Sequence, residues 1–217
     1  VAGGYVYAGS SNGVKRFAYD PTATEGGPAE DVVVGQPGGG HAKHTTHVYD
    51  GFLYVHSGSA DNASHEGGGA QADYDTARSL IKRFDLSKLT PGTPFQWSAG
   101  EAFTLGLRNV NGFARNELTG KIYGVVNGLD NQRYKGVNVT NDNPGEQVVE
   151  IAAGKKYGYP FCFTAQRIVD GNAVVPPGTQ LINVSYNGNV HDDAWCAANS
   201  DKPTTFVQAH SAPLDLT

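Results

Sequence analysis

The stretch LGLRNVNGFARNELTGKIYGVVNGLD, residues 105–130, decides the fold class. Two runs of apolar and β-branched residues, Gly112–Ala114 and Lys121–Val126, lie on either side of a Thr119-Gly120 turn. Short apolar runs around a glycine turn are typical of a β-hairpin. The stretch therefore predicts two antiparallel strands.

Polar residues lie at the open end of this hairpin. Arg108 and Asn109 precede the first strand, and Asn127-Gly128-Leu129-Asp130 follow the second. An arginine fork beside a glycine loop with accessible carbonyls suits an anionic cofactor that shares its site with a hard metal ion. A surface arginine followed by ordinary turn residues would give the same spacing, so this stretch alone leaves both readings open.

Composition indicates a globular, all-β chain. The 217 residues include 39% hydrophobic and 17% charged residues, and 29 glycines are scattered among short Val, Ile, Tyr and Phe runs. No apolar run approaches the roughly 18 residues of a membrane helix. The net charge of −5 offers no basic surface for nucleic acid. We expect one domain over residues 1–217 without a membrane or nucleic-acid partner.

A loose internal repeat refines the fold class. Three aromatic-bearing strands are each followed by a second strand: Tyr5–Ser10 by Gly13–Phe17, Phe52–Gly58 by Leu80–Asp85, and Ile122–Gly128 by Gln147–Ile151. Two of the second strands share nearly the same tetrapeptide, Val-Lys-Arg-Phe and Ile-Lys-Arg-Phe. Recurring strand pairs favour a β-propeller, and a β-sandwich is the alternative.

Polar, glycine-rich insertions separate these strands at residues 20–40, 59–76 and 128–145. If they emerge from the same position in successive blades, they cluster on one face of the molecule. Loops on a rigid scaffold commonly carry function. We therefore expect the functional site on that face.

The run His41-Ala-Lys-His44-Thr-Thr-His47 offers two interpretations. Three histidines at this spacing could bind zinc or copper. Neighbouring glycines and β-branched threonines argue against a helix, however, and in an extended strand His44 points away from the other two. A single functional histidine is the favoured interpretation, and histidine is a natural general base near neutral pH. A further turn, Asp142–Glu146, could supply carboxylates to a structural calcium ion or could simply be solvated.

Cysteines and sequons indicate a secreted, disulfide-bonded glycoprotein. Cys162 and Cys196 allow one intramolecular pairing, which would stabilise the fold by roughly 3–4 kcal/mol; two separate thiols are the alternative. The three sequons begin at Asn62, Asn138 and Asn183. Sequons also arise by chance in a chain rich in Asn, Ser and Thr, so their support is weak.

Taken together, these residues resemble the soluble quinoprotein sugar dehydrogenases, in particular the fungal pyranose dehydrogenase domain that uses pyrroloquinoline quinone (PQQ). The matching stretches, in the family's order, are His44–His47, Gly106–Asn109, Lys121–Asp130 and Gly154–Pro160. The resemblance implies a six-bladed β-propeller that carries PQQ and Ca²⁺ on its loop face. It also implies oxidation of the anomeric carbon of a pyranose to a lactone, with an external electron acceptor.

The resemblance also implies roles for single residues. His44 would take the hydroxyl proton while a hydride passes from the sugar carbon to the quinone. Arg108 would stabilise the charge that develops on the reduced quinone, and Asn109 would contact the cofactor. His44 and Arg108 would thus be the catalytic residues, and both would also bind the cofactor together with Asn109.

On the metal side, the carbonyls of Gly128 and Leu129 would ligate Ca²⁺, and Asn127 would lie against the cofactor ring. The chain departs from the family in two respects. His47 stands where fungal members typically carry arginine, and the chain has roughly half the length of a six-bladed member. We therefore expect more chain, a partner that completes the ring, or a copy without catalysis. The alternative function is a non-catalytic secreted propeller that binds carbohydrate or calcium.

Overall fold

The computed structural model describes residues 1–41, 45–63, 78–170, 173–186 and 190–216 of this chain. Within these ranges the fold is all-β, with short 3-10 helices and the α-helix α2 (Asp193–Asn199). The strands are β1 (Tyr5–Ser10), β2 (Gly13–Ala18), β3 (Glu30–Val34), β4 (Thr46–Tyr49), β5 (Phe52–Ser57), β6 (Leu80–Asp85), β7 (Phe95–Gln96), β8 (Glu101–Leu105), β9 (Val110–Arg115), β10 (Ile122–Val126), β11 (Arg133–Tyr134), β12 (Val137–Asn138), β13 (Glu146–Ile151), β14 (Lys155–Lys156), β15 (Cys162–Thr164), β16 (Ile168–Asp170), β17 (Ala173–Val175), β18 (Gln180–Ile182) and β19 (Thr205–Val207). The 3-10 helices are η1 (Leu86–Lys88), η2 (Trp97–Ala99) and η3 (Thr140–Asp142).

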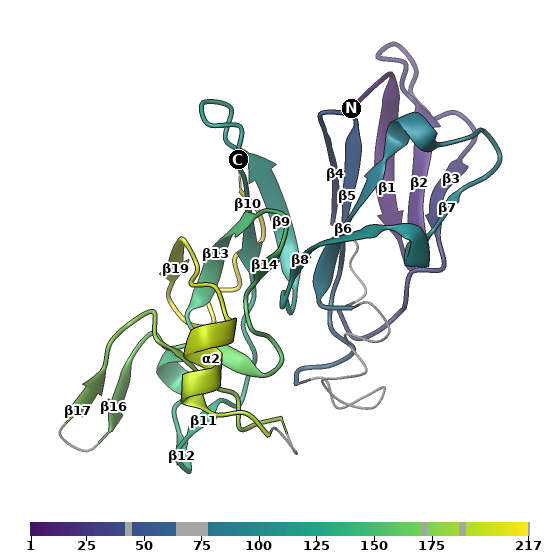
Figure 1. Cartoon of the computed structure of the whole chain (residues 1–217). Helices are drawn as coiled ribbons and strands as arrows, with labels where there is room; N and C mark the ends of the chain where they lie inside the picture. The colour runs from purple at the N-terminus through teal and green to yellow at the C-terminus, as the bar shows by residue number, and fades with distance from the viewer. Residues whose placement is uncertain (42–44, 64–77, 171–172, 187–189, 217) are drawn as a thin grey trace.

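Three sheets stand next to one another in chain order (Figure 1). Their strand orders are β1-β2-β3-β7, β14-β8-β6-β5-β4 and β19-β13-β10-β9. Each is built from antiparallel neighbours, apart from the parallel pairs β3 with β7 and β8 with β14. The β16–β17 hairpin projects as an arm at the lower left of Figure 1. We call the three sheets the first, second and third sheet.

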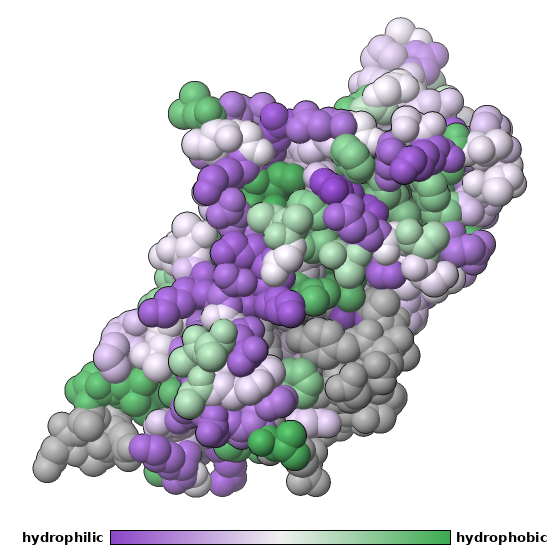
Figure 2. Space-filling view, in the orientation of Figure 1, coloured by the Kyte–Doolittle hydropathy of each residue, from purple (hydrophilic) through white to green (hydrophobic). Residues whose placement is uncertain are grey.

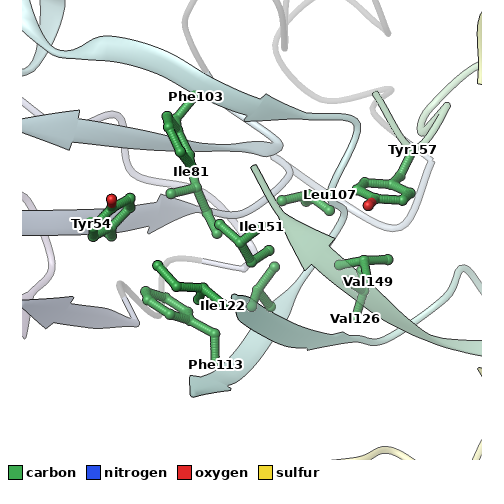
Figure 3. Packing of buried hydrophobic residues seen from close by; sticks show 11 residues of the cluster. Tyr54, Ile81, Phe103, Leu107, Phe113, Ile122, Val126, Val149, Ile151 and Tyr157 are labelled. Carbon is green, nitrogen blue, oxygen red and sulfur yellow. The ribbon is translucent and has the colours of Figure 1, made fainter. Parts of the chain in front are cut away.

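The second sheet is buried on both faces. Leu53, Val55 and Leu80 belong to the apolar cluster shared with the first sheet. Tyr54 and Ile81, their neighbours in sequence, belong to the cluster shared with the third sheet (Figure 3). Successive side chains of a strand point to opposite faces of the sheet. A strand with both faces buried therefore has apolar residues at consecutive positions. This packing explains the sequence Phe-Leu-Tyr-Val of β5.

The predicted repeat is confirmed at the level of strand pairs. The three pairs are β1 with β2, β5 with β6, and β10 with β13, and each is an antiparallel ladder. In the Lys-Arg-Phe strands, Arg16 pairs with Glu30 on β3, and Arg83 pairs with Glu101 on β8. In the β2–β3 and β6–β8 ladders the register also shifts immediately before the lysine of this sequence, Lys15 in β2 and Lys82 in β6. The shared tetrapeptide therefore reflects a shared bulge and a shared cross-strand ion pair.

The prediction that three insertions occupy equivalent positions is wrong for the first of them. Residues 20–40 follow both strands of their pair and contain β3, whereas residues 128–145 lie between the two strands of theirs. The β3 segment was hidden because only Val32 and Val33 of its five residues are buried. Residues 64–76 of the second insertion lie outside the described part of the chain.

The surface of the molecule is chemically mixed. Figure 2 shows hydrophilic and hydrophobic residues intermingled on one face, as is usual for a water-exposed protein surface. No helix in the described ranges has the length and apolar character needed to cross a membrane.

Candidate functional site

The candidate site lies at the end of the third sheet where β9 begins and β10 ends. These strands form the predicted hairpin, and Gly120 in its turn adopts the left-handed backbone conformation (φ +72°). Beyond the strands, the N–H of Asn127 donates to the carbonyl of Asn109 over 2.9 Å. This extra bond holds Arg108 and the Gly128 loop together, as the sequence predicted.

Arg108 is a buried, fixed fork. Its side chain is only 8% exposed. Nε donates to the carbonyl of Asn62 over 3.0 Å, Nη2 donates to Asn62 Oδ1 over 2.9 Å, and Nη1 donates to the carbonyl of Asn127 over 3.4 Å. A guanidinium carries five N–H groups, and these bonds engage three of them. Within the described part of the chain no hydrogen bond engages the other two N–H groups, which leaves them available to an anionic ligand.

The charge of Arg108 is only partly balanced by the protein. Burial lowers the pKa of Arg108, whereas Tyr159, Asp130 and Glu146 raise it. The carboxylate of Asp130 approaches Nη2 to 3.7 Å, but its side chain is 60% exposed and therefore largely solvated. Asp61 also raises the pKa of Arg108, yet burial is the largest effect, and a desolvated cation of this kind can accept an additional anion.

The loop after β10 presents two backbone carbonyls. A Cβ on Gly128 would come within 2.4 Å of Pro144 Cγ, so only glycine allows this close approach. Among the hydrogen bonds of the described residues, none ends on the carbonyl oxygen of Gly128 or Leu129. Both oxygens therefore keep their lone pairs, and calcium readily accepts such ligands.

Two further buried acceptors, on residues next to Arg108 and Gly128, lack a partner among the described residues. Asn109 Oδ1 and Asn127 Oδ1 are buried and have no hydrogen-bond partner among the described residues; of the two, Asn127 lines the small cavity beside the Gly128 loop. Buried polar atoms in folded proteins are nearly always paired. Donors of a bound ligand or of ordered water would satisfy these two amide oxygens.

Glu146 is a site residue whose role the sequence analysis missed. Its side chain is buried, and its Oε2 accepts a 2.6 Å hydrogen bond from the N–H of Gly128. Burial raises the pKa of Glu146, and the Gly128 bond acts in the opposite direction. The turn around Asp142 was considered as a source of calcium carboxylates. Glu146 instead anchors the loop whose carbonyls are available.

A small cavity of about 20 Å³ lies between this loop and the segment around Tyr157 and Tyr159. Arg108, Asn127 and Gly128 contribute to its lining. The volume suffices for about one water molecule. An organic cofactor would therefore lie over the loops rather than inside this cavity.

The histidine run is divided by the structure. His44 lies outside the described residues, so its predicted catalytic role stays a prediction. His41 lies near the site: its Nδ1 is 2.8 Å from Ser59 Oγ, and burial followed by the charge of Arg108 lowers its pKa to about 4. His47 lies on β4 and stacks on Tyr49, with ring centroids 5.7 Å apart. The alternation of side chains along a strand could not identify His41 as the histidine near the site, because His41 precedes β4.

The predicted disulfide is present, and the predicted sequons differ in accessibility. Cys162 and Cys196 are bonded and join the β15 segment to α2. Asn138 on β12 is exposed, whereas Asn183 is fully buried and donates to the carbonyl of Pro160. Asn62 is half-buried, and its amide contacts Arg108 and Asp130. Of the three predicted acceptors, only Asn138 therefore presents an accessible amide.

The fit of these residues to a quinone and a calcium ion rests on the observations above. A buried arginine with unengaged donors suits an anionic, carbonyl-bearing cofactor. Carbonyls on a glycine loop that accept no hydrogen bond from the described residues suit calcium. The donor set fits the predicted pair of ligands.

The chain is similar to several known proteins. The chain is 28% identical to a pyrroloquinoline quinone-dependent sugar dehydrogenase of Hypocrea jecorina, over 99% of this chain and 52% of that protein. A calcium structure of a Trichoderma reesei enzyme of carbohydrate-active enzymes family AA12 superposes with a TM-score of 0.86 at 27% identity, over 98% of this chain and 55% of that one.

The holo form of the pyranose dehydrogenase PQQ domain from Coprinopsis cinerea superposes with a TM-score of 0.84 at 25% identity. That match covers 100% of this chain and 55% of the other. The chain thus spans about half the length of the relatives that it matches. Because the TrAA12-like family model matches all of residues 1–217, this chain belongs to the TrAA12-like family.

Proposed function

We propose that this chain forms the cofactor-binding part of a PQQ- and calcium-dependent sugar dehydrogenase that oxidises the anomeric carbon of a pyranose to a lactone. When bound, PQQ supplies an electrophilic quinone that takes up the hydride, and Ca²⁺ supplies a Lewis acid that polarises it. The family membership and the names of the relatives support this reaction class.

One observation carries the proposal: a desolvated arginine stands beside two unengaged backbone carbonyls. Arg108 Nη1 donates to the carbonyl of Asn127, the residue just before Gly128 and Leu129. An anion that also contacts a metal ion would satisfy both halves of the arrangement. A buried cation and available backbone carbonyls have little reason to lie together in a molecule that binds neither an anion nor a metal ion.

In this proposal, separate residues bind the cofactor, orient it and accept the proton. Arg108 would bind the anionic cofactor and stabilise negative charge that develops on it. The buried oxygens of Asn109 and Asn127 would accept hydrogen bonds and orient it. His44 would accept the proton of the anomeric hydroxyl, in keeping with histidine's usual role near neutral pH.

The finer architecture is part of the same proposal. Three neighbouring sheets with a repeated bulge and ion pair are what one half of a six-bladed propeller would provide. The remaining blades would come from further chain or from a partner chain and would supply the other side of the sugar pocket. The disulfide and exposed Asn138 support secretion as the setting.

The test is a calorimetric titration of PQQ into the purified chain with Ca²⁺, repeated with excess chelator, and on a longer chain that includes the other half. Calcium-dependent binding followed by sugar-dependent dye reduction is the expected result. Loss of dye reduction in His44→Ala, with folding retained, would identify the base. Sugar or calcium binding without any affinity for PQQ in the longer chain would instead indicate a non-catalytic binding module.

A further inference from the structure

Asn62 contacts both halves of the candidate site. Its Oδ1 accepts from Arg108 Nη2 over 2.9 Å and from the backbone N–H of Asp130 over 2.8 Å. Its Nδ2 donates to the carbonyl of Asp130 over 3.0 Å. Its own carbonyl accepts from Arg108 Nε over 3.0 Å and from the Tyr159 hydroxyl over 3.1 Å. One residue therefore binds the guanidinium at two points and the backbone of Asp130 at two points.

These contacts join loops from two sheets. Asn62 follows β5 of the second sheet, and Asp130 follows β10 of the third sheet, 68 residues later. Asp130 closes the loop that carries the carbonyls of Gly128 and Leu129. Asn62 holds one end of this loop and also holds Arg108, so the distance between the cation and the two carbonyls depends on it.

We infer that Asn62 is a positioning residue: its amide fixes Arg108 relative to the Gly128 and Leu129 carbonyls and so prepares the site for an anionic ligand that also contacts a metal ion. The identification of that ligand as PQQ with Ca²⁺ rests on the proposed function, whereas the positioning contacts do not. Groups that orient ligating residues commonly change ligand affinity about 10- to 100-fold when they are removed.

The chemistry of these contacts requires an amide of this length. An aspartate would keep both acceptor bonds, but it would lose the donor to the Asp130 carbonyl and add a negative charge close to Asp130. A glutamine would displace the amide by one methylene. The same Nδ2 atom would be the acceptor of a glycan at the Asn62 sequon, so the positioning role predicts that Asn62 is unmodified.

The sequon provides a matched control. Asn62→Ala removes the side-chain amide contacts and Asn62→Gln displaces them, whereas Ser64→Ala destroys the sequon and leaves the amide in place. Three quantities would be measured on the longer chain: hydrogen exchange in residues 127–131, the rate of Arg108 modification by phenylglyoxal, and PQQ affinity in the presence of Ca²⁺. Thermal unfolding would show whether each variant is folded.

For Asn62→Ala we expect faster exchange at Asp130, faster modification of Arg108 and about a tenfold loss of PQQ affinity, with Ser64→Ala unchanged in all three. If Asn62→Ala does not fold, Asn62→Gln, which displaces the amide by one methylene, is expected to give the same changes at smaller size. Exchange and modification rates equal to the wild type would overturn the inference. So would a loosened loop with unchanged PQQ affinity, or a glycan found on Asn62. If the wild type binds no PQQ, the proposed function fails, and the exchange and modification rates alone decide the positioning role.

Discussion

The backbone N–H of Gly128 donates a 2.6 Å hydrogen bond to the buried carboxylate of Glu146. The bond fixes Gly128, one of the two residues whose carbonyls we propose as metal ligands. Because Glu146 begins β13, the loop is anchored to the rigid third sheet rather than to another loop. The loop geometry therefore depends on a charged group within the protein interior.

Replacing Glu146 by alanine is expected to lower the free energy of unfolding by about 1–3 kcal/mol, because the Gly128 N–H loses its buried acceptor. Glu146→Gln should cost less, since an amide oxygen can still accept the bond. Urea unfolding of both variants measures the difference. Glu101→Ala is the matched control: Glu101 pairs with Arg83 at the surface, and its loss should change stability by less than about 1 kcal/mol. An equal effect of the Glu146 and Glu101 variants would contradict the anchoring role.

Arg108→Lys is expected to weaken PQQ binding about tenfold or more, although it keeps the positive charge. A lysine ammonium cannot reproduce the planar fork that binds Asn62 at two points and Asn127 at a third. Titration of PQQ in the presence of Ca²⁺ provides the measurement. Arg133→Lys, at an exposed position of β11, is the control and should bind as the wild type does. Wild-type affinity in Arg108→Lys would show that charge alone is used.

His41 makes the fold sensitive to acid. Its pKa is lowered to about 4 in the folded chain, mainly by burial and next by Arg108, against about 6.5 when unfolded. Between these values the unfolded chain binds more protons, so the free energy of unfolding falls as the pH falls from about 6.5 to about 4. The raised pKa of Glu146 acts in the opposite sense.

We expect His41→Gln to lose less stability than the wild type between pH 7 and pH 5. Denaturant unfolding at the two pH values checks this difference. His47 has a lowered pKa as well, so part of the acid sensitivity should persist in the variant. An identical loss in wild type and variant would mean that His41 is solvated in the folded chain.

Of the predicted glycosylation sites, we expect Asn138 alone to be modified in secreted protein. Asn138 is exposed, whereas the Asn183 side chain is enclosed and bonded to the Pro160 carbonyl. Intact-mass spectrometry of Asn138→Gln and Asn183→Gln should show loss of a glycan in the first variant only. A glycan on Asn183 would require that modification precedes folding of this segment.

Much of the fold could be predicted from the chain. Short runs of apolar and β-branched residues around turns predicted the β9–β10 hairpin, and their repetition predicted the three strand pairs. The strand β3 was missed because its short apolar run lies among glycines and charges. Its place in the first sheet depends on pairing with β2, a contact that no local pattern specifies.

The candidate site was predicted in part. Arg108 and the Gly128 loop were found because a hairpin brings its own ends together. The contacts of Glu146 and Asn62 with the Gly128 loop could not be predicted, since each residue reaches the loop from a distant segment. In the sequence, Asn62 is recognisable only as the first residue of a sequon. Its contacts with Arg108 and Asp130 indicate the positioning role.

The sequence by itself determined what is local: the all-β class, the hairpin that pairs Arg108 with the Gly128 loop, and the availability of the Cys162–Cys196 pair. Tertiary structure alone decided which side chains surround Arg108. Asn62 follows β5 of the second sheet, and Glu146 begins β13, the neighbour of β10 in the third sheet. Burial then lowered the pKa of His41 and raised that of Glu146. These shifts arise from desolvation, which depends on how the sheets pack and not on any residue's neighbours in sequence.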